Sequence, residues 1–273
     1  MIMIIKYPQN ISRRNIMTYQ ALVFFDLDNT LLNTRLRVEE NIQNALTGLR
    51  ENNILPIIST GRSPAEIKIA LKQSNIDTCI FMNGAYITYK NRPIYRGQID
   101  TKLIQDIYER AERNGDALGF YNEHKFRITR ETKSARQHYR AFNSPLPIID
   151  PQFYKNNIIY MLLIIADKNY KYYSNIYGNQ LNFFRTSSYS MDTVLKNESK
   201  QSGITKLIDA MNFKDIPTYA FGDGINDLPM FKAVDHSIAM GNSIETVKKQ
   251  AEYITTKNTE GGIIQGLHHF NLL

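Results

Sequence analysis

The apolar positions of the chain alternate between continuous runs, which predict buried strands, and amphipathic stretches, which predict helices. The runs at 21–25, 54–59 and 218–221 are continuous and partly β-branched, as is typical of strands buried on both faces of a parallel sheet. The stretch 200–211 has its apolar residues on one helical face. Strands of this kind separated by helices predict an α/β fold.

Between residues 83 and 200 the pattern changes to shorter, mixed elements. A hairpin is predicted at 86–95 with its turn at Asn91 and Arg92, and Gly115 is a plausible end for the helix that follows. The other predicted elements are helices at 101–114, 131–142 and 170–177 and strands at 117–121, 126–129, 158–166 and 181–186. Helices and strands mixed over this length can form an independent α+β layer, so we expect an inserted domain.

Two pairs of aspartates follow predicted strands. Asp26 and Asp28 come directly after the run 21–25, and Asp223 and Asp227 come after the run 218–221 in a glycine-flanked loop. The carboxyl ends of parallel strands form one ligand-binding edge, and carboxylates gathered there repel one another unless a cation neutralises them. Mg²⁺ prefers such oxygen ligands. The alternative for Asp-x-Asp alone is a turn or helix-cap element.

A phosphate site is predicted after the strand 54–59. Ser59, Thr60, Gly61 and Arg62 offer a hydroxyl and free backbone amides before a helix, for which we expect Ser63 as the N-cap residue and Pro64 as the first helical residue. Lys200 is the candidate for a positively charged side chain at this phosphate site. Its assignment depends on the other motifs, because an isolated lysine is usually solvated.

Taken in chain order, at 26–30, 59–62, 200 and 222–227, the four motifs resemble those of the haloacid dehalogenase-like phosphatases and, more narrowly, of their Cof-type branch. Three further stretches, 81–85, 239–242 and 260–263, are also similar to that branch. There are two departures. Asn29 stands where the family most often has glycine, and Gln201 stands where glycine is usual, which leaves Lys196 as a second candidate for the role of Lys200.

The resemblance implies a fold and its boundaries. It implies a Rossmann-like, doubly wound parallel sheet at 18–83 and 197–273, with a type IIB α+β cap domain inserted at 84–196 and hinges near 83–84 and 195–197. Residues 1–17 are expected to be an N-terminal extension that arises from a mis-called start, with Met17 as a natural beginning. A tail or a short ordered arm is the alternative.

The resemblance also implies an activity, namely Mg²⁺-dependent hydrolysis of small phosphorylated metabolites through an aspartyl-phosphate, with a sugar phosphate as the first guess. Asp26 is then the nucleophile and Asp28 the acid and base. Metal ligands are Asp26, Asp28 through its carbonyl, Asp223 and Asp227, and phosphate ligands are Thr60, Gly61, Lys200 and Asn226. A phosphotransferase or phosphomutase that uses the same aspartate is one alternative, and a non-catalytic regulator that binds nucleic acid or protein is another.

The cap is expected to choose the substrate. Tyr121, Arg127 and Arg130 lie near a predicted turn at 122–125 and are the first candidates for substrate specificity, although outward solvation is the alternative for each.

Composition and charge limit the classes of binding partner that we expect. The net charge of +7 comes mostly from the segments 1–16 and 124–140, and a solvated helix face accounts for the second of these better than nucleic-acid binding does. The single cysteine, Cys79, excludes a disulfide framework and favours a reducing cytoplasm. Since no apolar run has the length of a membrane span, we expect a cytoplasmic enzyme whose partner is a small molecule, with neither nucleic acid nor membrane as a partner.

Overall fold

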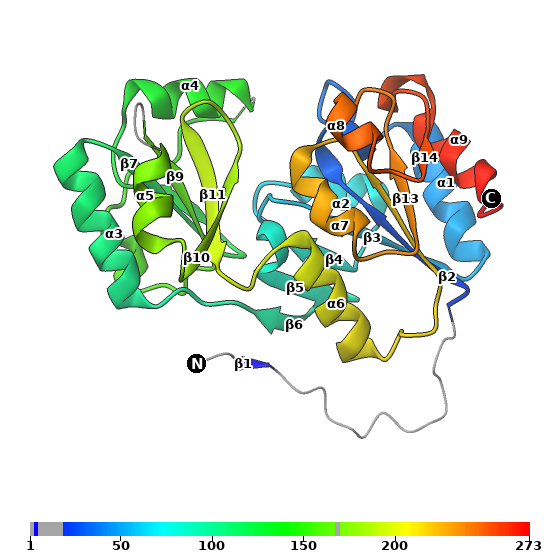
Figure 1. The fold of residues 1–273 in the computed structure, drawn as a ribbon, viewed down its shortest axis with the longest axis horizontal. Helices are drawn as coiled ribbons and strands as arrows, with labels where there is room; N and C mark the ends of the chain where they lie inside the picture. Colours follow the sequence, from blue (N-terminus) through cyan, green and yellow to red (C-terminus); the bar gives the residue numbers. More distant parts are fainter. Residues whose placement is uncertain (1–2, 5–18, 143, 167–169) are drawn as a thin grey trace.

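The computed structural model describes residues 3–4, 19–142, 144–166 and 170–273 of the chain. Within these residues the strands form two sheets, one of nine strands in the order β1-β6-β5-β4-β3-β2-β12-β13-β14 and one of five in the order β10-β11-β9-β7-β8. Figure 1 shows the two sheets side by side, each with its own helices.

The middle of the larger sheet is parallel. Its parallel strands are β4 (Cys79–Phe81), β3 (Ile54–Ser59), β2 (Ala21–Phe25), β12 (Thr218–Gly222), β13 (His236–Ala239) and β14 (Tyr253–Ile254). Helices α1 (Glu40–Glu51), α2 (Lys68–Ser74) and α9 (Gly262–His269) pack on one face, and α6 (Lys200–Met211), α7 (Leu228–Phe231) and α8 (Glu245–Lys248) pack on the other. The predicted α/β fold with a doubly wound parallel core is confirmed.

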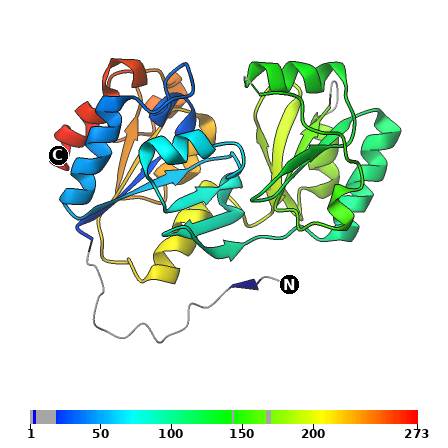
Figure 2. The ribbon, with the colours of Figure 1, turned by 180° about the vertical axis from the view of Figure 1, so that it is seen from behind.

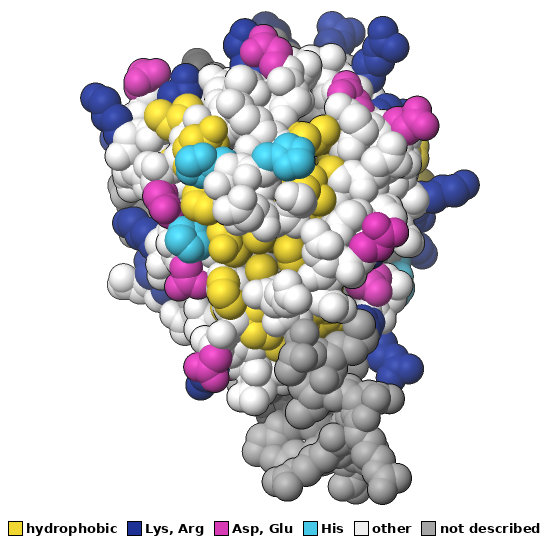
Figure 3. Space-filling view, turned by 90° about the vertical axis from the view of Figure 1, so that its right-hand side faces the viewer, with side chains coloured by type: hydrophobic (Ala, Val, Ile, Leu, Met, Phe, Trp, Pro, Cys, Tyr) yellow, Lys and Arg dark blue, Asp and Glu magenta, His cyan; other side chains and the backbone are white. Residues whose placement is uncertain are grey.

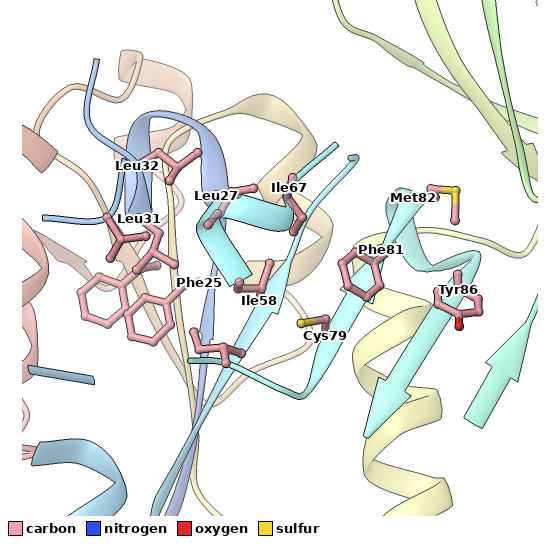
Figure 4. Packing of buried hydrophobic residues seen from close by; sticks show 14 of the residues in the cluster. Phe25, Leu27, Leu31, Leu32, Ile58, Ile67, Cys79, Phe81, Met82 and Tyr86 are labelled. Carbon is pink, nitrogen blue, oxygen red and sulfur yellow. The ribbon is translucent and has the colours of Figure 1, made fainter. Parts of the chain in front are cut away.

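Strand β2 is buried on both faces, as its unbroken apolar run predicts. Val23 and Phe25 belong to the cluster under α1 and α9, whereas Leu22 and Phe24 belong to the cluster under α6. Figure 4 shows the first cluster near the carboxyl ends of the strands, with Phe25 and Leu31 close together and Cys79 among apolar side chains. Burying each such side chain contributes roughly 1.5–3 kcal/mol, so the ends of β2 and β3 are held rigidly.

The hairpin β5 (Tyr86–Tyr89) and β6 (Arg92–Arg96) extends the core sheet. β5 pairs antiparallel with β4, so that Cys79 lies opposite Thr88, and β6 continues the same sheet. The predicted boundary at residue 84 is therefore wrong for this hairpin, because its backbone hydrogen bonds belong to the nine-stranded sheet. The chain leaves that sheet only after β6.

The five-stranded sheet is antiparallel and lies between β6 and α6 in the sequence. It consists of β7 (Ala117–Tyr121), β8 (Phe126–Ile128), β9 (Met161–Ile165), β10 (Leu181–Arg185) and β11 (Ser190–Leu195). Helices α3 (Thr101–Asn114) and α5 (Tyr170–Tyr177) cover one face. The other face is turned toward the nine-stranded sheet, with α4 (Lys133–Ala141) at its edge. This unit is the cap.

The two connections between core and cap lie next to each other (Figures 1 and 2). A Cβ atom on Gly97, which follows β6, would lie 2.9 Å from Oε1 of Glu198, which precedes α6. The buried Glu198 carboxylate accepts hydrogen bonds from the Tyr95 hydroxyl and from Lys206 Nζ. These contacts fix both connections to the end of the core sheet.

Most of the predicted elements have nearly the predicted bounds. The helix 101–114 and the strand 117–121 agree with α3 and β7, and Gly115 ends α3 with φ of 74°. Two differences matter for the site. Helix α2 begins at Lys68 instead of after Ser63, because Glu66 accepts hydrogen bonds from the backbone N–H and the hydroxyl of Ser63 and closes a turn there. Strand β11 was not predicted.

Part of the N-terminal segment forms a strand. Met3 and Ile4 form β1, which pairs antiparallel with β6 so that Met3 lies opposite Arg96. Residues 1–2 and 5–18 lie outside the described residues, so the expectation that an N-terminal extension arises from a mis-called start stays a prediction. No helix in the described ranges combines the length and the apolar character that a membrane crossing requires.

Candidate active site

The predicted motifs meet at the carboxyl ends of four neighbouring strands. Asp26 follows β2, Thr60 follows β3, Asn83 follows β4 and Asp223 follows β12. From β2 the sheet continues through β3 and β4 on one side and through β12 and β13 on the other. Such a switch point opens a crevice at the carboxyl edge, where open α/β sheets bind ligands.

The turn after β2 explains the first departure from the family pattern. Asn29 has φ of 54°, a left-handed conformation that glycine and asparagine adopt more readily than other residues. The backbone carbonyl of Asn29 accepts a hydrogen bond of 2.9 Å from Asn242 Nδ2. Asparagine therefore fits the backbone geometry of this position.

Three carboxylates lie together beneath the turn. Asp26, Asp223 and Asp227 can each offer one oxygen within 4.8 Å of the others. Asp26 and Asp227 are buried. Burial and the neighbouring carboxylates raise the pKa of Asp26 well above its usual range and raise the pKa of Asp223 to about 7. Ionisation of all three carboxyl groups is therefore unfavourable unless a cation lies beside them.

Lys200 supplies one positive charge to this trio. It is the first residue of α6, whose N-terminus is capped by Ser199. Its buried ammonium group contacts Asp26 and lies 2.5 Å from Asp227 Oδ1. Lys196, the alternative candidate, is exposed. A hard divalent cation fits the remaining charge, because the donor set consists of carboxylate oxygens and because Asp26 and Asp223 ionise more readily beside a cation.

Asp227 also organises its own loop. Its Oδ2 accepts hydrogen bonds of 2.9 Å from the backbone N–H groups of Asp223 and Gly224. The Thr30 hydroxyl donates to Asp223 Oδ1 at 3.3 Å. Asp227 therefore holds the backbone of the loop that carries Asp223.

The loop after β3 presents Thr60, Gly61 and Arg62 to the same space. Thr60 Oγ1 accepts a hydrogen bond of 3.1 Å from the Arg62 backbone N–H. The guanidinium of Arg62 donates two hydrogen bonds, of 2.6 and 2.8 Å, to the Asp28 carboxylate. This bidentate pair orients Asp28, a role for Arg62 that its place in the motif did not reveal.

A cavity of about 290 Å³ lies between these loops and the cap. Of the predicted site residues, Asp26, Asp28, Thr60, Gly61, Asp223, Asn226 and Tyr121 line it. Lys200 and Asp227 lie buried behind Asp26. Their contact with Asp26 nevertheless places both within the same cluster.

Two predicted cap residues are not at the cavity. Arg127 alternates with Phe126 and Ile128 along β8, so its side chain lies on the helix-covered face, with its guanidinium 5.5 Å from the centre of the Phe153 ring. Arg130 forms an ion pair with Glu112 of α3. Neither Arg127 nor Arg130 lines the cavity, so the structure favours the alternative in which they point away from the substrate.

The cap instead contributes residues that the sequence analysis missed. Asp192 of β11 and His138 and Tyr139 of α4 line the cavity. Burial raises the pKa of Asp192 to about 8 and lowers the pKa of His138 to about 4. The alternation of Ser190, Asp192 and Val194 with Met191 and Thr193 was a signal for a strand with a partly polar face.

Comparison with known proteins gives consistent results. A family model described as haloacid dehalogenase-like hydrolase matches residues 23–267. The putative phosphatase YkrA of Bacillus subtilis (strain 168) is 28% identical over 254 residues, which cover 92% of this chain and 98% of that protein. The 5-amino-6-(5-phospho-D-ribitylamino)uracil phosphatase YwtE of the same organism is 26% identical over 272 residues, which cover 88% of this chain and 94% of that protein.

The fold comparison agrees with the sequence comparison. A solved structure described as a subclass IIB sugar phosphatase is similar with a TM-score of 0.81 and 26% identity. The match covers 93% of this chain and 100% of that one. The similarity therefore includes the cap as well as the core.

Proposed function

This chain belongs to the haloacid dehalogenase-like hydrolases and is a phosphatase, and on that basis we propose that it hydrolyses small phosphorylated metabolites with Mg²⁺ as cofactor and an aspartyl-phosphate on Asp26 as intermediate. The observation that carries the proposal is the cluster of Asp26, Asp223, Asp227 and Lys200 at the carboxyl edge of the sheet. The family is the one that the motifs predicted.

In the first step an Asp26 carboxylate oxygen attacks phosphorus. The new O–P bond forms as the bond from phosphorus to the leaving oxygen breaks, and Asp28 donates a proton to that oxygen. Splitting the displacement in this way lowers each barrier. Asp28 enters this step protonated. Its pair with Arg62 favours the ionised form, which is the form that the first step leaves and that the second step uses.

In the second step a water molecule attacks the same phosphorus atom. Asp28, now ionised, accepts a proton from the water, and the bond from phosphorus to Asp26 breaks, which releases inorganic phosphate. The hydroxyl of Thr60, the backbone of Gly61, Lys200 and Asn226 would bind the phosphoryl oxygens, where charge accumulates in the transition state. Both steps thus use the same residues.

The cation would be held by Asp26, Asp223 and Asp227, with the Asp28 carbonyl as a further ligand. When bound, Mg²⁺ supplies positive charge that binds the phosphate and stabilises the transferring phosphoryl group. The raised pKa values of Asp26 and Asp223 support this part of the proposal, because a cation favours their ionised forms.

A small metabolite is the substrate class that the cavity supports. The cap covers the site and leaves about 290 Å³, which leaves little room for a phosphoprotein or polynucleotide. Among the relatives, one acts on a phosphorylated ribitylamino compound and one is a sugar phosphatase. We therefore propose a phosphorylated sugar or polyol, with no nucleic acid or membrane as partner.

Replacing the nucleophile tests the proposal. Asp26→Asn should lower kcat on phenyl phosphate by at least about 10³-fold, because an amide is a poor nucleophile. Circular dichroism should show an unchanged fold. Asp209→Asn, on the exposed side of α6, is the matched control and should keep the wild-type rate. A near wild-type rate for Asp26→Asn would contradict the mechanism.

A further inference from the structure

Asp192, on cap strand β11, lies beside the loop that follows β3 and presents Thr60, Gly61 and Arg62. Its Oδ2 would lie 3.0 Å from a Cβ atom on Gly61. Asn83 Nδ2, at the end of β4, donates a hydrogen bond of 3.1 Å to the same oxygen. A cap strand thus brings a carboxyl group directly beside the place where we position the phosphoryl group.

The Asp192 carboxyl group has unused acceptor capacity. Both oxygens of a carboxyl group can accept hydrogen bonds, whether the group is protonated or ionised, yet Asn83 is its one hydrogen-bond partner among the described residues. No described lysine, arginine or histidine forms an ion pair with it. Its exposed fraction is 9%, and what remains exposed opens into the cavity. Burying a polar group with so few partners is unfavourable.

Neighbouring polar groups of the cap are already paired. The hydroxyls of Tyr121 and Tyr139 lie 3.0 Å apart and bond each other. His138 Nδ1 lies 2.9 Å from Ser190 Oγ. Thr186 Oγ1 bonds the same Ser190 hydroxyl at 2.9 Å. Asp192 is therefore the cap group best placed to accept a new hydrogen bond from a ligand.

We propose that Asp192 selects the leaving group of the substrate by accepting a hydrogen bond from a hydroxyl or ammonium donor near the phosphoester. This inference rests on the proposed phosphatase function and adds the residue that reads the rest of the ester. The preferred substrates then carry a donor close to the phosphate, as polyol, sugar and amino-sugar phosphates do. Esters without such a donor leave Asp192 unpaired and are poor substrates.

The test compares Asp192→Ala and Asp192→Asn with wild type on three probes, namely ribitol 5-phosphate, glucosamine 6-phosphate and phenyl phosphate. For the preferred donor-bearing ester, Asp192→Ala should lower kcat/KM by about tenfold or more, which corresponds to the loss of one hydrogen bond. Phenyl phosphate, which has no donor, should change by less than about threefold. Asp106→Asn, on the helix-covered side of the cap, is the control and should change none of them.

Asp192→Asn separates the two kinds of donor. An amide oxygen still accepts a hydrogen bond from a neutral hydroxyl, so that substrate should keep part of its rate. A bound ammonium group favours the ionised form of the Asp192 carboxyl group, and an amide has no such form, so this ester should lose as much with Asp192→Asn as with Asp192→Ala. Thermal unfolding of each variant shows whether it is folded.

Two outcomes overturn the inference without touching the proposed function. One is an equal loss on all three probes, which would make Asp192 a link between cap and core only. The other is a wild type that hydrolyses phenyl phosphate better than any donor-bearing ester. If wild type released phosphate from no ester at all, the proposed function itself would fail and this inference with it.

Discussion

At the scale of single residues, the buried carboxyl group of Asp192 combines a functional position with a cost in stability. Burial is the main cause of its raised pKa, and the nearby Glu66 carboxylate raises it further, whereas Asn83 and Arg62 lower it. Asp28 also faces it. A group whose charge is this unfavourable in the folded state is unsuited to a structural role alone, because an amide would fill the same volume without the charge.

We expect Asp192→Asn to stabilise the protein at alkaline pH. The folded pKa of about 8 lies above the unfolded value of about 3.9. Between these values the folded state keeps a proton that the unfolded state has released, so wild-type stability falls as the pH rises through this window. Asparagine removes the titration, and the variant should gain about 2 kcal/mol at pH 9 and little at pH 4.

Urea unfolding of both proteins at pH 4, 6, 8 and 9 measures this difference, with Asp106→Asn as the control that should show no such trend. If the variant were less stable than wild type at pH 9, the Asp192 carboxylate would have a stabilising cationic partner that its described contacts do not include.

At the scale of elements, the position of Lys200 depends on how closely α6 approaches the turn after β4. Gly84 in that turn has φ of 93°, and a Cβ atom there would overlap the carbonyl oxygen of Ser199. Ser199 caps α6 and directly precedes Lys200. The backbone of the turn therefore sets the distance of the ammonium group from Asp26.

Gly84→Ala should consequently impair both stability and catalysis. We expect a loss of about 2–4 kcal/mol in the free energy of unfolding and a lower kcat, since α6 must shift and carry Lys200 with it. Gly115→Ala is the matched control. Gly115 also has positive φ but nothing within 4 Å, so its substitution should cost about 1 kcal/mol and leave kcat unchanged. Equal kcat values for the two variants would contradict this account of α6.

The elements also show how far sequence patterns reach. The apolar runs of β2, β3 and β12 and the amphipathic helix α3 were predictable, because burial on one or both faces leaves a clear periodicity. β11 was missed since one of its faces lines a cavity, so Ser190 and Asp192 occupy positions where a core strand would have apolar residues. The hairpin β5–β6 was predicted as a hairpin, but short-range turn signals do not say which sheet a hairpin joins.

The site residues also divide into those that the sequence could predict and those that it could not. Asp26, Asp28, Thr60, Asp223 and Lys200 are tied to strand ends or to a helix N-terminus, so their convergence follows from the parallel sheet. The cap residues face the cavity according to the register of an antiparallel sheet, and a shift of one residue exchanges the two faces. Tyr121 and Arg127 were therefore both predicted at the cavity, although Arg127 of β8 lies opposite Phe120 of β7 and so on the other face of the sheet from Tyr121.

At the scale of the whole molecule, the acidic cluster of Asp26, Asp223 and Asp227 at the carboxyl edge of the core sheet predicts that activity requires a divalent cation. Activity should disappear in excess chelator and return with Mg²⁺, because the three acidic residues repel phosphate when no cation is bound. Beryllium fluoride with Mg²⁺ should inhibit by occupying the phosphoryl position on Asp26. Phosphate release measured at constant ionic strength checks both, and full activity in chelator would contradict the proposed metal site.

Part of the positive charge of the segment 124–140 lies on helix α4. Lys133, Arg136 and Arg140 of α4 are exposed to solvent, and Arg136 forms an ion pair with Glu131. Figure 3 shows the other side of the molecule, which the core forms, and there too basic and acidic side chains are interspersed. This arrangement agrees with a solvated surface better than with a nucleic-acid groove.

The adjacency of the two connections at Gly97 and Glu198 has a consequence for how such an enzyme can diversify. The chain leaves the core and returns to it at one place. The core sheet therefore does not restrict the length or the shape of the inserted cap domain. Another inserted domain whose two ends lie equally close together could replace the cap and leave the core domain intact. If the cap selects the ester as we propose, the catalytic residues and the residues that select the substrate are encoded in separate segments of the gene.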